Sequence, residues 1–116
     1  MPLIEICALP QANDVDVPRV LQAVTAAVSE AIPCRREAVW VTWRPLDGYA
    51  VGDGLAGAQP TDTHAPVVHL YANRPADAIE RACDAIESVL VNELSLAEGN
   101  VFVTVQPVYA LPDQQG

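Results

Sequence analysis

Residues 2–9, with the sequence PLIEICAL, return in similar form as residues 66–73, PVVHLYAN. Each stretch begins with proline, continues with two branched aliphatic residues and one ionisable residue, and then returns to an aliphatic residue. A second match joins residues 39–45, VWVTWRP, to residues 101–107, VFVTVQP. The two matches are shifted along the chain by nearly the same amount, so they belong to one duplication. The chain therefore contains one structural unit written twice.

A helical pattern lies between the matched stretches of each unit. In the first unit, Asp16 is a candidate N-cap and Pro18 stands in the first turn. In the second unit, we expect Asn73 or Arg74 to cap the helix and Pro75 to occupy its first turn. Apolar residues then recur at spacings of three and four, which predicts one buried stripe per helix. The first stripe comprises Val17, Val20, Leu21, Val24, Val28 and Ile32, and the second comprises Ile79, Cys83, Ile86, Leu90 and Leu94.

The order strand, helix, strand in each unit predicts an α+β fold. A crossover of this length makes the two strands of a unit parallel. Two such units side by side give a four-stranded mixed sheet with both helices on one face. We expect a single domain over residues 1–116, with repeat units at about 2–45 and 66–109 and a linker at 46–65. Chance similarity of two amphipathic strands is the alternative, but the shared order of elements argues against it.

The second face of this sheet needs a cover. The strands show little polar alternation, because their valines stand opposite Trp40, Trp43 and Phe102. Self-association is the simplest cover for an apolar sheet face. We therefore expect a symmetric oligomer.

The composition of the chain argues against several classes of partner, namely nucleic acids, anionic lipids and metal ions. The net charge is −9, with six arginines and no lysine, and such an acidic surface repels nucleic acid and anionic lipid. Three cysteines without a CxxC spacing indicate free thiols, and the histidines, His64 and His69, have no ligand-like partner at helical spacing, so no metal site is expected. No apolar run approaches membrane-spanning length and no signal peptide is evident, which predicts a cytoplasmic protein.

The opening MPLIEI followed by a duplicated β-α-β unit resembles the tautomerase superfamily, which includes 4-oxalocrotonate tautomerase and macrophage migration inhibitory factor. The resemblance covers residues 2–109 in architecture and is concentrated at Pro2 and at residues 39–41. It implies a homotrimer that acts on a small molecule without a cofactor. It also implies that Pro2, exposed by removal of Met1, is the general base.

Such a role suits the chemistry of Pro2. A free α-amino group has a pKa of about 7.7–8.0, and desolvation lowers that pKa toward the value a base needs near neutral pH. Two observations stand against this role. Proline is common as a second residue, and a retained Met1 would turn the nitrogen of Pro2 into an amide.

The resemblance also suggests the partners of Pro2. Arg74 directly follows a predicted strand. Members of the superfamily that resemble malonate semialdehyde decarboxylase have a substrate-binding arginine in this place, so Arg74 is the second candidate catalytic residue. The alternative is that Arg74 is an exposed arginine at the start of a helix. In members that resemble macrophage migration inhibitory factor, a neighbouring subunit contributes a tyrosine to the active site, and Phe102 occupies the position of that tyrosine. Thr104 occupies the position of an asparagine in the same members. Trp40, Tyr49 and Phe102 could wall an apolar pocket, although Trp40 and Phe102 would serve equally as interface or core aromatics.

Some family positions differ here. In 4-oxalocrotonate tautomerase, which has one β-α-β unit per chain, arginines occupy the positions of Ala12 and Trp40. In macrophage migration inhibitory factor, a lysine occupies the position of Ile32. The expected activity is keto–enol or 1,3-proton transfer on a small 2-oxo or enol carboxylate. The missing cations suggest that the substrate is less charged or more aromatic, or that the activity is slight. The alternatives are a cofactor-independent decarboxylase, a dehalogenase or hydratase, and a non-catalytic trimeric binding protein with a decayed site.

Overall fold

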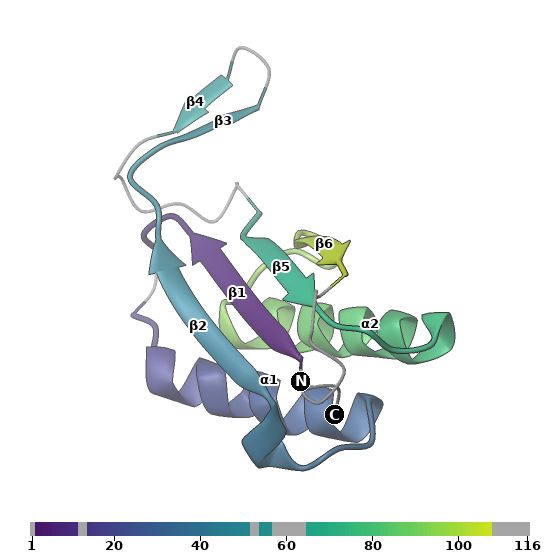
Figure 1. The fold of residues 1–116 in the computed structure, drawn as a ribbon. Coiled ribbons are helices and arrows are strands. Elements are labelled where there is room, and N and C mark those ends of the chain that lie inside the picture. Colours follow the sequence, from purple (N-terminus) through teal and green to yellow (C-terminus); the bar gives the residue numbers. More distant parts are fainter. Residues whose placement is uncertain (1, 12–13, 52–53, 57–64, 108–116) are drawn as a thin grey trace.

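The computed structural model describes residues 2–11, 14–51, 54–56 and 65–107, with the backbone alone at 49, 51 and 54–56. Its elements follow the predicted order, strand, helix, strand, in each half (Figure 1). The first half contains β1 (Leu3–Ala8), α1 (Val17–Ala31), a short 3₁₀ helix η1 (Arg36–Ala38) and β2 (Trp40–Pro45). The second half contains β5 (Val67–Tyr71), α2 (Ala76–Glu93) and β6 (Phe102–Gln106).

The four long strands form one mixed sheet in the order β2-β1-β5-β6. Strand β1 pairs in parallel with β2, and β5 pairs in parallel with β6, as the crossover in each unit requires. The two units join through the antiparallel pair of β1 and β5, in which Leu3 lies opposite Tyr71 and Cys7 opposite Val67. The predicted fold class, an α+β fold with a duplicated β-α-β unit, is confirmed.

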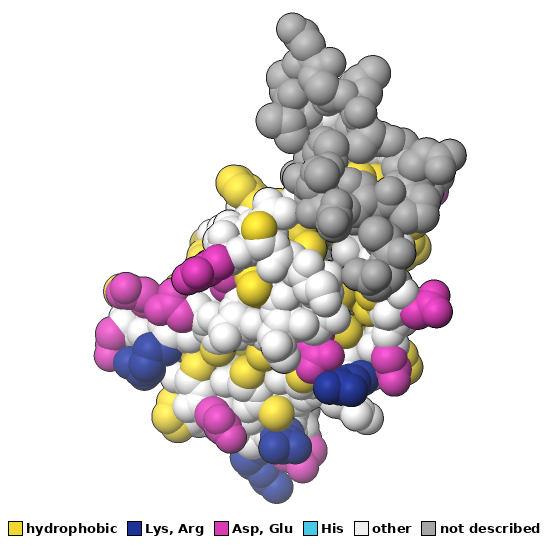
Figure 2. All heavy atoms as spheres, turned by 180° about the vertical axis from the view of Figure 1, so that it is seen from behind, with side chains coloured by type: hydrophobic (Ala, Val, Ile, Leu, Met, Phe, Trp, Pro, Cys, Tyr) yellow, Lys and Arg dark blue, Asp and Glu magenta, His cyan; other side chains and the backbone are white. Residues whose placement is uncertain are grey.

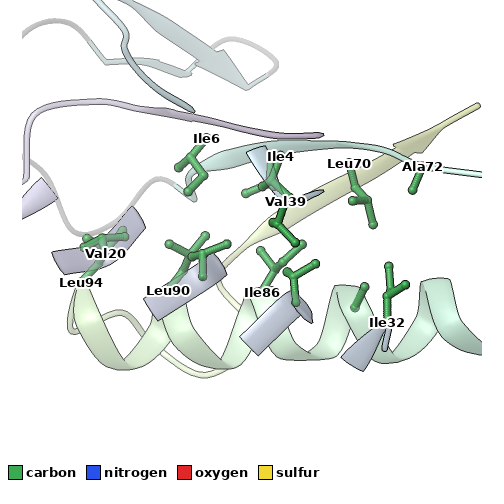
Figure 3. Packing of buried hydrophobic residues seen from close by; sticks show 14 of the residues in the cluster. Ile4, Ile6, Val20, Ile32, Val39, Leu70, Ala72, Ile86, Leu90 and Leu94 are labelled. Atoms are coloured by element: carbon green, nitrogen blue, oxygen red, sulfur yellow. The ribbon is translucent and has the colours of Figure 1, made fainter. Parts of the chain in front are cut away.

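The core lies between the sheet and the two helices, which cover the same face (Figures 1 and 3). Alternate strand residues point into it, so that Ile4 and Ile6 of β1 and Val68 and Leu70 of β5 are fully buried. The helices contribute residues at intervals of four: Val20, Val24 and Val28 from α1, and Ala78, Ala82, Ile86 and Leu90 from α2.

The two helices occupy equivalent places in the repeat. Val24 corresponds to Ile86 and Val28 to Leu90, and all four side chains are fully buried. The shift that aligns β1 with β5 is slightly larger than the shift that aligns the helices, so the connection from β1 to α1 is longer than that from β5 to α2. Loops accept such length changes more readily than packed elements do.

The helix starts differ from each other. As predicted, Asp16 caps α1, and its Oδ1 accepts a hydrogen bond from the backbone N–H of Arg19 at 3.2 Å. The prediction that Asn73 or Arg74 caps the second helix is wrong. Helix α2 begins after Pro75, which is the N-cap residue and has no side-chain donor or acceptor, so the N-cap residue itself makes no capping hydrogen bond.

The helices run antiparallel, and two equivalent arginines tie their ends together. Arg19, near the start of α1, forms an ion pair with Glu93 at the end of α2, with Nε and Oε2 3.2 Å apart. Arg81, the repeat equivalent of Arg19, donates from its Nε to the carbonyl oxygen of Ala31 at the end of α1, at 3.2 Å. A cation near the last carbonyl groups of a helix also favours the helix dipole.

The other face of the sheet is not covered within the described part of the chain. Leu3, Glu5 and Cys7 of β1 point to it, together with Trp40 and Phe102, which begin the two edge strands. These two aromatic side chains are 57% and 58% exposed. Placing Trp43 on this face was wrong: three residues beyond Trp40, it points to the other face and packs against the core.

The connection between the units contains a hairpin rather than a plain linker. Strands β3 (Tyr49–Val51) and β4 (Gly54–Ala56) pair antiparallel and project from one end of the sheet (Figure 1). The rest of the predicted linker beyond Ala56, up to His64, lies outside the described residues.

The surface agrees with the acidic composition. Seen from behind, acidic and basic side chains are interspersed with small apolar patches (Figure 2). Within the described residues, no helix combines the length and hydropathy that a membrane span requires.

Candidate active site

Pro2 lies at the very end of the sheet, one residue before β1. Its side chain is almost completely buried, and its carbonyl oxygen accepts a hydrogen bond from the backbone N–H of Trp40 at 3.0 Å. That bond continues the parallel ladder between β1 and β2 beyond Leu3 and Trp40. The register of two strands therefore fixes the position of the proline ring.

Two described aromatic residues flank the start of β1 next to Pro2: Trp40 on β2, and Tyr71 on β5, which lies opposite Leu3. Trp40 is the one that was predicted from the sequence as a site residue. It begins β2, pairs with Leu3, and shares the uncovered face with that residue. More than half of its side chain is exposed. Trp40 contacts Pro2 through its backbone N–H, because its ring lies on the uncovered face, whereas the Pro2 ring is buried on the core side of the sheet. The exposed Trp40 ring is available to a ligand or to a second subunit.

Arg74 belongs to the same end of the sheet. It follows β5 by three residues, and the last residue of β5, Tyr71, lies opposite Leu3. Its side chain is partly buried, and its Nη1 donates to the carbonyl oxygen of Asn73 at 2.9 Å. Pro2, Trp40 and Arg74 come from three separate segments of the sequence. The register of the strands places all three at the same end of the sheet.

Phe102 lies at the diagonally opposite corner of the sheet. It begins β6 and pairs with Val67, which in turn lies opposite Cys7 of β1. Four residues of extended strand separate the level of Cys7 from that of Leu3, a distance of roughly 13 Å along the strand. Within one chain, Phe102 therefore does not join Pro2.

Thr104 lies at mid-sheet, and Tyr49 lies in the hairpin. Thr104 pairs with His69, and its hydroxyl oxygen is 2.7 Å from Nδ1 of that histidine. Tyr49 begins β3 and is described by its backbone only. Neither residue is brought to Pro2 by the contacts of the described chain.

A second group of reactive side chains, absent from the sequence prediction, lies on the uncovered face. Glu5, Cys7 and His69 each place one ligand-type atom within 4.8 Å of the others. The thiol of Cys7 is 3.6 Å from Oε1 of Glu5. Burial, together with the charge and hydrogen bond of Glu5, raises the pKa of this thiol. A search for helical ligand spacing could not find this group, because it forms across two strands.

Comparisons with known proteins find no match to the sequence but several similar structures. The sequence matches no protein-family model and no curated protein. Its structure is similar to that of native fused 4-OT, with a TM-score of 0.74 at 19% identity, over 97% of this chain and 94% of that one. It is also similar to MIF2 of Leishmania major, with a TM-score of 0.72 at 10% identity, over 99% of this chain and 95% of that one.

A third structure, macrophage migration inhibitory factor of Toxoplasma gondii, gives a TM-score of 0.65 at 15% identity and covers 97% of both chains. These likenesses span nearly the whole chain, including the duplicated β-α-β arrangement that the sheet order shows here. At such low identity they establish architecture and not activity. The chain therefore has the fold of the tautomerase superfamily.

Proposed function

We propose that this protein is a cofactor-independent tautomerase in which the amine of Pro2 transfers a proton on a small 2-oxo or enol carboxylate. The observation that carries the proposal is the position of Pro2. The ring is buried at the end of β1, its carbonyl oxygen accepts a hydrogen bond from the backbone of Trp40, and Arg74 follows β5 at the same end of the sheet, in a fold similar to that of fused 4-OT.

The reaction requires a free secondary amine. Once Met1 has been removed, the nitrogen lone pair of Pro2 accepts a proton from an enol oxygen or from a carbon next to a carbonyl group. The resulting ammonium returns that proton to another atom of the substrate, so the substrate is isomerised and no net proton is consumed. Burial of the ring favours the neutral amine, which is the form that accepts a proton.

Arg74 supplies the positive charge that this reaction needs. The net charge of −9 repels a carboxylate substrate, so a cation at the site has to offset that repulsion. The planar guanidinium binds a carboxylate through two hydrogen bonds and stabilises the enolate as it develops. The exposed Trp40 ring would provide an apolar surface for the substrate or for a neighbouring subunit.

The assembly we propose is a homotrimer in which a neighbouring subunit completes the site. Phe102 and Thr104 are separated from Pro2 within one chain, and Phe102 is more than half exposed at the opposite corner of the same uncovered face. Contact between the uncovered faces or edges of subunits would bring such residues to Pro2. Fused 4-OT proteins have been solved as symmetric and asymmetric trimers, which supports this assembly.

The test compares two equivalent prolines. Phenylpyruvate and 2-hydroxymuconate serve as enol substrates, and kcat/KM is measured for the wild type, Pro2→Ala and Pro66→Ala. Pro66 is also buried, and its carbonyl oxygen accepts a hydrogen bond from the N–H of Phe102 at 3.0 Å, so it is the matched structural control. We expect Pro2→Ala to lower kcat/KM by about 10²-fold or more, and Pro66→Ala to leave it nearly unchanged.

Equal activity of Pro2→Ala and the wild type would overturn the mechanism. Absence of activity on both substrates, in a chain whose intact mass shows that Met1 is gone, would favour the non-catalytic alternative. Size-exclusion chromatography with light scattering tests the trimer separately, and a monomer would contradict that part of the proposal.

A further inference from the structure

The uncovered face of the sheet holds a group that the tautomerase proposal does not use. Glu5, Cys7 and His69 combine a carboxylate, a thiol and an imidazole, with one ligand atom of each within 4.8 Å of the others. Three residues of extended strand separate Glu5 from Pro2, or roughly 10 Å, so within one chain this group is distinct from the candidate active site.

The strand register fixes this arrangement. Glu5 and His69 are direct partners on the antiparallel strands β1 and β5. Cys7 lies two residues beyond Glu5 and therefore points to the same face, diagonal to His69. Because all three positions belong to central strands of the sheet, the backbone that carries the ligands is rigid.

A hydrogen-bond chain orients the imidazole. Thr104 donates from its hydroxyl to the carbonyl oxygen of Val68 at 3.4 Å. The hydroxyl oxygen, 2.7 Å from Nδ1 of His69, is then the acceptor of the Nδ1–H bond. This tautomer leaves the lone pair on Nε2, and an imidazole whose other nitrogen is held in this way is the usual form of a metal ligand.

From this geometry we propose that Glu5, Cys7 and His69 form a zinc site, with Thr104 as its supporting residue. Zinc accepts thiolate, imidazole and carboxylate ligands together, in a tetrahedral arrangement. With bonds of about 2.0–2.3 Å, such a site sets neighbouring ligand atoms about 3.5 Å apart. The thiol and carboxylate of the cluster are already 3.6 Å apart.

The ligand set also fits the charge of the ion. A carboxylate and a thiolate together neutralise the two positive charges of zinc. Burial of the site against a second subunit would therefore leave no uncompensated charge in the interface. Three protein ligands leave the fourth position for water or another small oxygen donor. Glu5 and Cys7 are half-buried and buried, which limits competition from bulk water at the other positions.

Metal content and cobalt spectroscopy test the site without any assay of activity. Tag-free protein is stripped with a chelator, loaded with zinc alone, dialysed, and analysed for metal per chain. A parallel sample is loaded with cobalt, whose bond to a thiolate gives a near-ultraviolet charge-transfer band. We expect one zinc per chain and a cobalt–thiolate band that is lost in Cys7→Ser, with zinc also lost in His69→Gln.

Controls separate this site from adventitious binding. Cys83→Ser removes a half-buried thiol of α2, and His64→Gln removes the other histidine; both variants should keep the zinc. Thr104→Val should retain zinc with about 10–100-fold weaker affinity, as loss of a supporting hydrogen bond does elsewhere. If Cys7→Ser fails to fold by circular dichroism, Thr104→Val and His69→Gln decide the question.

The proposal is wrong if wild-type protein binds less than one zinc per chain, or if His69→Gln and Thr104→Val bind zinc as tightly as the wild type. Neither result bears on the role of Pro2, because the tautomerase assay is performed without metal.

Discussion

At one end of the sheet Pro2 lies beside Trp40, and at the other end its repeat equivalent Pro66 lies beside Phe102. Each proline carbonyl oxygen accepts a hydrogen bond from the N–H of its aromatic neighbour at 3.0 Å. Both rings are almost completely buried. The backbone arrangement is thus the same at both ends of the sheet. The two ends differ in the chemical groups that they carry.

Two features distinguish the ends. The nitrogen of Pro66 lies inside the chain and is an amide without basicity, whereas that of Pro2 becomes an amine when Met1 is removed. Arg74 follows β5 near Pro2, while its repeat equivalent, at the other end of the sheet, is Pro10. On the proposed mechanism, the duplicated framework therefore carries one site, because the base and the cation occur together at one end alone.

The most severe way to break this comparison is to make Pro2 resemble Pro66. A leucine inserted between Met1 and Pro2 prevents removal of Met1 and converts the proline nitrogen into an amide. We expect kcat/KM to fall by about 10²–10⁴-fold, because general base catalysis is lost. Intact mass confirms the extended terminus. Removal of a protease-cleavable extension should restore activity, and full activity of the extended chain would contradict the prediction.

The shared scaffold predicts equal costs in the core of the two halves. Ile6 and Leu70 are repeat equivalents, and both are completely buried. Replacing either with alanine should lower the free energy of unfolding by about 2–5 kcal/mol, because each change leaves a cavity. Val105→Ala, at a position that is 45% exposed, is the control with a small effect. Denaturant unfolding at one protein concentration measures all three, and a cost in only one half would break the equivalence.

Arg74 sharpens the difference between the ends. Arg74→Gln should lower kcat/KM by about 10–100-fold, the value of a charged hydrogen bond of about 1.5–3 kcal/mol, by raising KM and lowering kcat, because Arg74 is proposed both to bind the carboxylate and to stabilise the enolate. Arg35→Gln removes an exposed charge, paired with Glu37 at 4.0 Å, and controls for net charge. Equal losses in the two variants would show that Arg74 acts only through the overall field.

The helix starts provide a smaller contrast. Asp16 caps α1 through a hydrogen bond, and α2 has no side-chain cap. Asp16→Ala should therefore lower the free energy of unfolding by about 1 kcal/mol. Pro75→Ala loses no capping bond and should cost less, which thermal unfolding can measure. A larger cost at Pro75 would show that the second helix start depends on its backbone restriction.

The smallest expected effect concerns Asp77. The hydrogen bond from Arg81, at 3.1 Å, holds the pKa of this carboxyl below its ordinary value. The stabilisation is present above the ordinary pKa of an aspartate and is lost as the pH falls through the lowered pKa of the folded state. The difference in Tm between the wild type and Asp77→Asn should thus be small at neutral pH and vanish in acid.

The fold followed from the sequence because the duplication supplied the same order of elements twice. The stripe of α1 was predicted at Val20, Val24 and Val28, which are buried. In α2, the buried Ala78 and Ala82 were missed, because alanine is too small to mark a stripe. Trp43 was assigned to the wrong face, although its spacing from Trp40 places the two on opposite sides of a strand.

The candidate site was predictable only in part. Pro2 and Arg74 stood out as the chain terminus and as a cation after a strand, features visible in one dimension. Glu5, Cys7 and His69 were not grouped, because their contact depends on the register between β1 and β5. Nothing in either strand fixes that register alone, since it arises when the two units pack together.

Glu5 and His69 have one further property: they are repeat equivalents, and they lie directly opposite one another. A local two-fold axis therefore passes between them. In a dimer of identical units, any residue at that position would face its own copy, and two carboxylates opposite each other would repel. Joining two units in one chain lifts this restriction, so the axis can carry an unlike pair. Covalent fusion thus gives the centre of the sheet an asymmetry that no symmetric dimer could encode.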